Sequence, residues 1–314
     1  MLAGCGGSQR PIGVPGAMPQ TMAIATHADR GKSWMLPGTS GEDLLYVSNP
    51  DKGTVTVYSY ESQQLVGTLT GFKEPWGVCA TNQRVWVTDR GTGDIIEYSH
   101  GGTKHVRVLK SDSQNVPLSC AHDPKSGNLA VTNRYNLAVF LHGKGKPKYY
   151  TGANAGIDNF MAASYDEKGN LWINGWTYDS ASYMVPRFAE LPRNASSLSA
   201  VRLDGCNKNN CPAAVWSQWV GKTWLVNLDV WHVGRDLHGK LLDYIGLDDY
   251  GDGSAFFVTK PTASGSQQFI GADDYEGGPN GSVQYWDYPS GGEPTATITD
   301  GIDEPFGVTV SYAS

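Results

Sequence analysis

One recurring pattern constrains the fold of this chain more than any other sequence feature. An aliphatic residue is followed three positions later by an aromatic residue, at a spacing between copies of roughly 40–50 residues, which is the range of propeller blades. The pairs are Val55/Tyr58, Ile95/Tyr98, Leu137/Phe140, Val185/Phe188, Leu228/Trp231 and Val283/Trp286. β-rich runs precede and follow each pair. The pattern therefore predicts an all-β fold, a six-bladed β-propeller of four-stranded blades.

The first repeat lacks an inner strand ahead of it, and the end of the chain supplies one. The run PFGVTVS from Pro305 is similar to PWGVCAT from Pro75, which opens the second repeat. We therefore predict that the C-terminal strand, 305–311, pairs with 44–49 and completes the first blade, which removes the open edge of the ring. Blades four to six are less regular, so five or seven blades remain alternatives.

The composition suits this architecture and excludes some partners. The 314 residues include 39 Gly, 16 Tyr and 10 Trp but only 18% charged residues, as expected for short strands joined by tight turns. With a net charge of −7, the chain has no basic face for nucleic acid. No run approaches the roughly 18 apolar residues of a membrane-spanning helix. We expect a monomer.

The N-terminal segment indicates export. Residues 2–5, Leu-Ala-Gly-Cys, have the lipobox pattern of bacterial lipoproteins, and a Gly/Ser-rich stretch follows. We expect Cys5 to be lipidated in a longer parent with a signal peptide upstream of Met1, and the protein to be periplasmic or on the outer surface. Residues 1–43 are predicted to form a tether in which the apolar cluster 34–36 docks, and 44–314 to form the propeller.

The remaining cysteines fit an oxidising compartment. Cys206 and Cys211 bracket a polar loop of four residues, and we predict a local disulfide between them. Cys79 and Cys120 fall near equivalent places in adjacent repeats. Buried free thiols are the favoured interpretation for this second pair, and a bond between blades is the alternative.

Short motifs add a resemblance to known families. The cycle P-x-G-V, N-L-x-V-T-N and I-x-x-Y-S resembles NHL-type and streptogramin-lyase-like six-bladed propellers. The start LAGCGGS, with YWDYPSGG and PFGVTVS near the end, is similar to propeller lipoproteins of environmental bacteria. The resemblance implies the fold over about residues 40–314, whereas this architecture hosts lyases, lactonases, peptidases and binding modules.

Candidate ligand-binding residues gather at one end of the predicted channel, which we term the mouth. The loops after each second strand and before each inner strand share this face. The candidates are Trp76, Glu74, Arg90, Arg134, Asp158, Phe160, Glu304 and Phe306. Trp76 and Phe306 either plug the channel or form a binding platform, and Arg90 either pairs with Glu74 or stacks on a ring.

A second set at the mouth recurs in every repeat. The second strands end in a polar residue at Asn49, Asp89, Asn133, Asn174, Asn227 and Asp273. Because Asn and Asp side chains order the backbone that follows them, we interpret this set as structural rather than ligand-binding.

Catalytic and metal-binding signals are weak. None of the seven histidines forms a zinc-type pair, and no G-x-S-x-G elbow occurs, so no catalytic residue is assigned. Acidic residues Asp248, Asp249 and Asp252 suit Ca²⁺ by their clustered oxygens, but the EF-hand spacing fails. We expect no cofactor, with Ca²⁺ as the alternative.

The function predicted from these features is a non-catalytic, extracytoplasmic module that binds a polymer, peptide or protein at the channel mouth. The partner would be an unidentified protein, peptide or glycan, and contact with the membrane would occur only through the lipid anchor. A metal-assisted lyase or lactonase at the same mouth is the alternative, and a structural scaffold is the third hypothesis.

Overall fold

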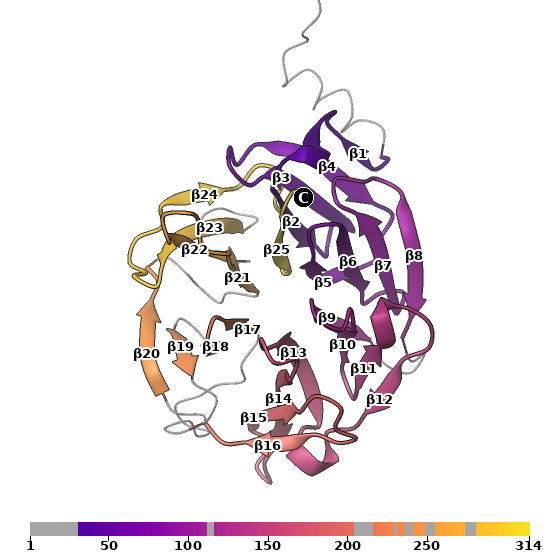
Figure 1. The fold of residues 1–314 in the computed structure, drawn as a ribbon, viewed down its shortest axis with the longest axis vertical. Coiled ribbons are helices and arrows are strands. Elements are labelled where there is room, and N and C mark those ends of the chain that lie inside the picture. Colours follow the sequence, from indigo (N-terminus) through magenta and orange to yellow (C-terminus); the bar gives the residue numbers. More distant parts are fainter. Residues whose placement is uncertain are drawn as a thin grey trace, which may run out of the picture.

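The computed structural model describes residues 31–111, 116–203, 216–228, 231–235, 241–248, 255–273 and 281–314. Within these ranges the strands form five four-stranded sheets and one five-stranded sheet, arranged radially around a central axis (Figure 1). The prediction of an all-β propeller with four-stranded blades is confirmed. Among the same residues, no helix combines the length and apolar character needed to cross a membrane.

Each four-stranded sheet is an antiparallel meander whose strands follow one another in sequence. Counted from β5, so that the second repeat of the sequence is the first of these blades, the first blade has β5 (Pro75–Ala80), β6 (Arg84–Asp89), β7 (Asp94–Ser99) and β8 (His105–Lys110), and the second has β9 (Pro117–His122), β10 (Leu129–Asn133), β11 (Leu137–Phe140) and β12 (Lys148–Tyr150). The third has β13 (Asn159–Tyr165), β14 (Leu171–Tyr178), β15 (Met184–Leu191) and β16 (Ser199–Val201). The others have β17 (Ser217–Val220), β18 (Thr223–Leu228), β19 (Trp231–Arg235) and β20 (Leu241–Gly246), then β21 (Phe256–Val258), β22 (Gln267–Asp273), β23 (Ser282–Tyr288) and β24 (Ala296–Ile298).

The five-stranded sheet joins the two ends of the described chain, and we term it the closure sheet. From the channel outward it contains β25 (Val308–Ser311), β2 (Leu44–Asn49), β3 (Thr54–Ser59), β4 (Leu65–Thr70) and β1 (Trp34–Met35). In the β25–β2 pair, Val308 lies opposite Val47 and Ser311 opposite Leu44. The predicted closure by the C-terminal strand is therefore confirmed, over 308–311.

The inner strands form an uninterrupted ring. β5 contacts β9, and β13, β17, β21 and β25 follow in turn, until β25 contacts β5 again. The closing strand is part of the core, because Val308 and Val310 are only 1% and 2% exposed. Since every inner strand has a neighbour on both sides, the ring leaves no open end between its first and last sheets.

The aliphatic–aromatic repeat marks the packing between blades. The described aromatic members are at most 5% exposed: Tyr58, Tyr98, Phe140, Phe188 and Trp286. Each sits on a third strand, where large side chains fill the widening space between adjacent sheets. The repeat is thus a core signature, which explains why it predicted the architecture and carried no information about a ligand.

The glycine of the P-x-G-V motif is required by the close approach of neighbouring inner strands. A Cβ atom on Gly77 would lie 2.4 Å from the carbonyl oxygen of Leu118, and one on Gly307 would lie 2.3 Å from that of Trp76. A backbone oxygen cannot move aside as a flexible side chain can. Only glycine therefore fits at these two positions.

A hydroxyl on the second strand bridges each of these approaches. Ser48 Oγ accepts from the Gly307 N–H (2.7 Å) and donates to the Trp76 carbonyl (2.5 Å). Thr88 Oγ1 on β6 accepts from the Gly77 N–H (2.8 Å) and donates to the Leu118 carbonyl (3.0 Å). The hydroxyl links its own inner strand to that of the next sheet, so it contributes to the cohesion of the ring.

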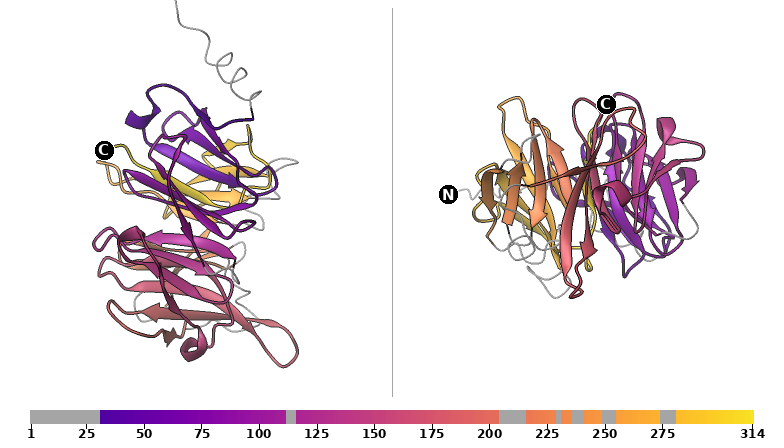
Figure 2. Two further views of the ribbon diagram at one scale, coloured as in Figure 1. Left: turned by 90° about the vertical axis from the view of Figure 1, so that its right-hand side faces the viewer. Right: turned by 90° about the horizontal axis from the view of Figure 1, so that it is seen from below.

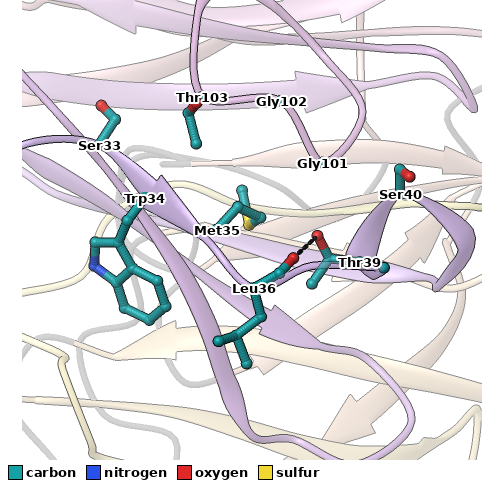
Figure 3. Close-up of a pocket in the computed structure, with 10 residues that line it drawn as sticks. Ser33, Trp34, Met35, Leu36, Thr39, Ser40, Gly101, Gly102 and Thr103 are labelled. Carbon is teal, nitrogen blue, oxygen red and sulfur yellow. Dashed lines mark hydrogen bonds between the residues drawn. The ribbon is translucent and has the colours of Figure 1, made fainter. Parts of the chain in front are cut away.

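The N-terminal apolar cluster docks as predicted. Trp34 is 7% exposed, and Trp34 and Met35 pair with β4 as a fifth strand. Beside them, the Thr39 hydroxyl donates to the Leu36 carbonyl (3.0 Å), and this segment with 101–103 lines a cavity of about 460 Å³ (Figure 3). The prediction of four strands in every sheet is wrong here, because the segment before β2 adds a strand to the outer edge.

Candidate functional site

Two of the repeated polar residues at the strand ends, Asp89 and Asn49, bond the backbone of a neighbouring loop. The Asp89 carboxylate accepts from the backbone N–H groups of Lys73 and Glu74, at 2.9 Å each. Asn49 Oδ1 accepts from the Asp303 N–H (3.0 Å). Asp89 is 1% exposed and Asn49 is fully buried. Each side chain holds the loop that enters the inner strand of its own sheet, so the structural interpretation of these two positions is supported.

Aromatic side chains from three inner-strand segments meet at the mouth end of the channel. Trp76 lies on β5 and Phe306 precedes β25, and their ring centroids are 3.9 Å apart. Phe306 also meets Trp216 edge-on at 6.1 Å. β17, which follows Trp216, is separated from β25 in the ring by β21, so this contact reaches beyond neighbouring strands. We term Trp76, Phe306 and Trp216 the aromatic plug.

The plug agrees with the structural alternative for Trp76 and Phe306. Phe306 is 9% exposed and Trp216 is 7% exposed, and both belong to the largest apolar cluster. Trp76 is half-buried and packs against the same cluster. Sequence reasoning did not single out Trp216, although it precedes Ser217 in an inner strand as Trp76 precedes Gly77.

Glu74 and Arg90 cover the outer side of the plug. The Arg90 guanidinium forms an ion pair with Glu74 and lies 3.7 Å from the centroid of the Trp76 ring. The two alternatives predicted for Arg90 therefore occur together. Arg90 and Glu74 thus neutralise each other over the Trp76 ring, whereas the buried indole N–H of Trp76 has no hydrogen-bond partner among the described residues.

Two other candidates lie away from the plug, on the rim of the second and third blades. Arg134 is exposed, stacks on Tyr135 at 5.3 Å and donates through Nε to Asn159 Oδ1 at 3.4 Å. Asp158 is exposed and accepts a hydrogen bond from the Thr177 hydroxyl of β14. Their hydrogen bonds connect the turn at Tyr135 to the base of the β14–β15 hairpin.

The remaining mouth candidates fall into different surroundings. Phe160 is 0% exposed and packs in the core cluster of the second and third blades, so it does not contribute to the mouth surface. The reason is strand alternation, which turns Phe160 toward the core. Glu304 is exposed and adopts φ = 47°, a left-handed conformation rare outside glycine.

Among the described residues of the mouth face, the β14–β15 hairpin stands out. Both strands have eight residues, and Figure 2 shows the hairpin extending beyond the blades. Its tip exposes Tyr178 (51%), Tyr183 (66%) and Met184 (46%). Asp179 Oδ1 accepts from the N–H groups of Ala181 (2.9 Å) and Tyr183 (3.0 Å), which orders the turn.

The cysteines differ from the favoured expectation. Cys79 on β5 and Cys120 on β9 form a disulfide, with 5.7 Å between their Cα atoms. The free-thiol interpretation was wrong because the two side chains face each other across the gap between adjacent inner strands. Cys206, Cys211 and Cys5 lie outside the described residues.

No metal site is found in the part of the chain that the structure describes, since none of its residues form a group of three or more His, Cys, Asp or Glu that could hold an ion. Asp248 is exposed, whereas Asp249 and Asp252 lie outside the described residues. His122 ends β9 at the face opposite the mouth, where burial lowers its pKa.

Comparisons with known proteins agree with the architecture. No family model matches the sequence, and no curated protein matches it. A chain from the crystal structure of a nidogen/laminin complex is similar with a TM-score of 0.69 and 12% identity, covering 87% of this chain and 99% of that one. A Bacteroides caccae protein of unknown function gives 0.62 and 14%, covering 86% and 99%. A functionally unknown Desulfotomaculum acetoxidans protein gives 0.57 and 10%, covering 87% and 100%. The class defined by fold is the β-propeller, and the NHL-type resemblance stays a prediction.

Proposed function

We propose that this propeller is a non-catalytic, extracytoplasmic binding module whose partner, a protein, peptide or polymer, docks on the rim of the mouth face. The main support for this proposal is the β14–β15 hairpin, which exposes Tyr178, Tyr183 and Met184 on an ordered turn. Tyrosine and methionine are enriched at protein interfaces. An ordered tip loses little conformational entropy on binding, so its contacts contribute more to affinity.

The neighbouring rim extends this surface. Tyr135 is 54% exposed, and Arg134 stacks on it. Asp158 lies at the base of the hairpin through its bond with Thr177. The surface thus combines aromatic faces with one charge of each sign, whereas the aromatic plug and the Arg90–Glu74 pair occupy the mouth end of the channel. The proposed contact is therefore on the rim rather than in the channel.

The disulfide bears on the compartment in which the protein works. The Cys79–Cys120 disulfide supports an oxidising compartment, in keeping with an exported protein.

We also infer that the closure sheet serves as the sixth blade, because β25, β2, β3 and β4 have the strand order of a blade and β1 is an appended fifth strand. A propeller of similar fold occurs in a nidogen/laminin complex, so the architecture is compatible with a protein partner.

The test compares wild-type protein with a Tyr178→Ala/Tyr183→Ala variant on arrays of glycans and of bacterial envelope peptides. Because both side chains are exposed, we expect an unchanged melting temperature and at least about a tenfold loss of affinity for whichever probe the wild type retains. Tyr149→Ala is the matched control, since Tyr149 is 43% exposed on outer strand β12. Equal retention by wild type and the double variant would refute the rim site.

A further inference from the structure

The face opposite the mouth carries a groove between the first and second blades. Its volume is about 570 Å³, and it is lined by the turn 81–84, by Trp86, Glu97 and Arg107, and by 142–144 with His122. The inner strands β5 and β9 both end at this face, so the groove lies at the end of the channel away from the aromatic plug. His122 also lines the channel interior.

Positive charge exceeds negative charge in this groove. The lining side chains include Arg84, Arg107 and Lys144 and one carboxylate, Glu97, so three cations minus one anion leave a side-chain charge of +2; Ser314, the last residue of the printed sequence, also lines the groove, and counting its α-carboxylate leaves +1. The whole chain has a net charge of −7. A local excess of positive charge on an acidic protein attracts anions to this place in particular.

The Glu97 carboxylate fixes the two guanidinium groups. Glu97 is 4% exposed, and its Oε1 lies 3.0 Å from Arg84 Nε and its Oε2 3.5 Å from Arg107 Nη1. Arg107 Nη1 also donates to the Gly143 carbonyl (2.9 Å). Both arginines are therefore held in place while their side chains remain 41% and 40% exposed at the groove. Preorganised guanidinium groups lose little entropy when they bind an oxyanion.

The groove holds several donors without a hydrogen-bond partner, together with one such acceptor, Glu97 Oε2, which has only the 3.5 Å ion-pair contact with Arg107. Among the described residues, Nη2 of Arg84 and of Arg107 have no protein partner, and the buried indole N–H of Trp86 also has none. Trp86 stacks on His122 with ring centroids 5.1 Å apart. The neighbouring carboxylate of Asp123 accepts from the Lys125 N–H and the Ser126 hydroxyl and is not part of the lining.

We propose that this groove is a binding site for an oxyanion group, a carboxylate, sulfate or phosphate, carried on a body about the size of a sugar ring. The planar guanidinium fork matches two oxygens of any of these groups. The volume of the groove is many times the roughly 30 Å³ occupied by one water molecule, so the groove accommodates the ring of such a ligand as well as its anionic group.

The test uses four probes that share one ring: glucuronate, glucose 6-sulfate, glucose 6-phosphate and neutral glucose. Calorimetric titration of the full chain is performed at constant ionic strength and pH 7. We expect at least one anionic probe to bind with one-to-one stoichiometry and a Kd of about 1 mM or tighter. We expect no heat from glucose. The three anionic arms distinguish the carboxylate, sulfate and phosphate sources.

Two variants locate the site. Arg84→Gln is expected to weaken binding at least about tenfold. Lys144→Gln leaves the Glu97 ion pairs intact and is expected to weaken binding about threefold or more. Because of this second variant, the test does not depend on whether Arg84→Gln folds. Lys52→Gln, on the mouth face, is the charge-matched control and should bind as wild type. The proposal is overturned if no anionic probe binds at about 10 mM, or if Lys52→Gln weakens binding as much as Lys144→Gln.

Discussion

The Cys79–Cys120 disulfide offers the most direct test of how the ring is held together. The bond joins inner strands β5 and β9 across 41 residues of sequence, so it closes one whole repeat. In the chain-entropy model, a closed loop of this length lowers the free energy of folding by about 4 kcal/mol relative to the reduced chain. In a propeller of this size, that corresponds to a melting temperature about 5–10 °C lower once the bond is lost.

The perturbation is the Cys79→Ala/Cys120→Ala variant, because alanine leaves no buried hydroxyl where both cysteines are at most 8% exposed. Differential scanning calorimetry of this variant is compared with wild type in oxidised form and with wild type in the presence of a reductant. The variant and the reduced wild type should melt together, below the oxidised protein. Mass spectrometry of the oxidised protein identifies the linked peptides.

One result would refute the reasoning. If oxidised wild type, reduced wild type and the variant melt at the same temperature while the linked peptides are present, the bond does not stabilise the ring by restricting the unfolded chain. In that case, the Gly77–Leu118 approach and its Thr88 bridge would hold β5 to β9 without covalent help.

Three further predictions concern closure, plug and pH. Deleting 305–314 removes the buried side chains of Phe306, Val308 and Val310, each of which contributes about 1.5–3 kcal/mol to the stability of the fold. The truncated protein should therefore be cleaved rapidly in limited proteolysis. A truncated protein as resistant to the protease as the wild type would contradict the closure. Trp76→Ala should lower the unfolding free energy in urea by about 3 kcal/mol if the plug is structural, and an unchanged midpoint would favour a platform. Burial lowers the pKa of His100, which contacts Ser311 and Glu42, below the unfolded value of about 6.5. The unfolded chain then binds more protons, so stability should be retained above pH 6.5 and fall below it, and His100→Gln should reduce that fall in acid melting curves.

The repeat was readable because each part of it follows from local chemistry and packing. The aromatic third-strand positions, such as Tyr58 and Trp286, recur at a fixed spacing because every gap between blades needs the same filling. The P-x-G-V glycines recur because Gly77 and Gly307 meet the backbone of the next sheet. The similarity of PFGVTVS to PWGVCAT was therefore sufficient to predict which end of the chain closes the ring.

The candidate site was less predictable, because function depends on which side chains face each other across repeats. Sequence position placed Trp76 and Phe306 at the mouth, but only packing against Trp216 made them a plug. Strand alternation turned Phe160 into the core, and the gap between two inner strands brought Cys79 to Cys120. The exposed tyrosines of the β14–β15 hairpin had no periodic signal at all.

The sequence by itself determined the class of fold, the closure and the core, because these arise from patterns that repeat along the chain and act between adjacent elements. Tertiary structure alone decided that Trp76, Phe306 and Trp216 meet at the mouth, that Glu97 gathers Arg84 and Arg107 on the opposite face, and that a disulfide joins two blades. These features depend on distances between residues far apart in sequence. Such distances are set by the geometry of the closed ring, which no local pattern encodes.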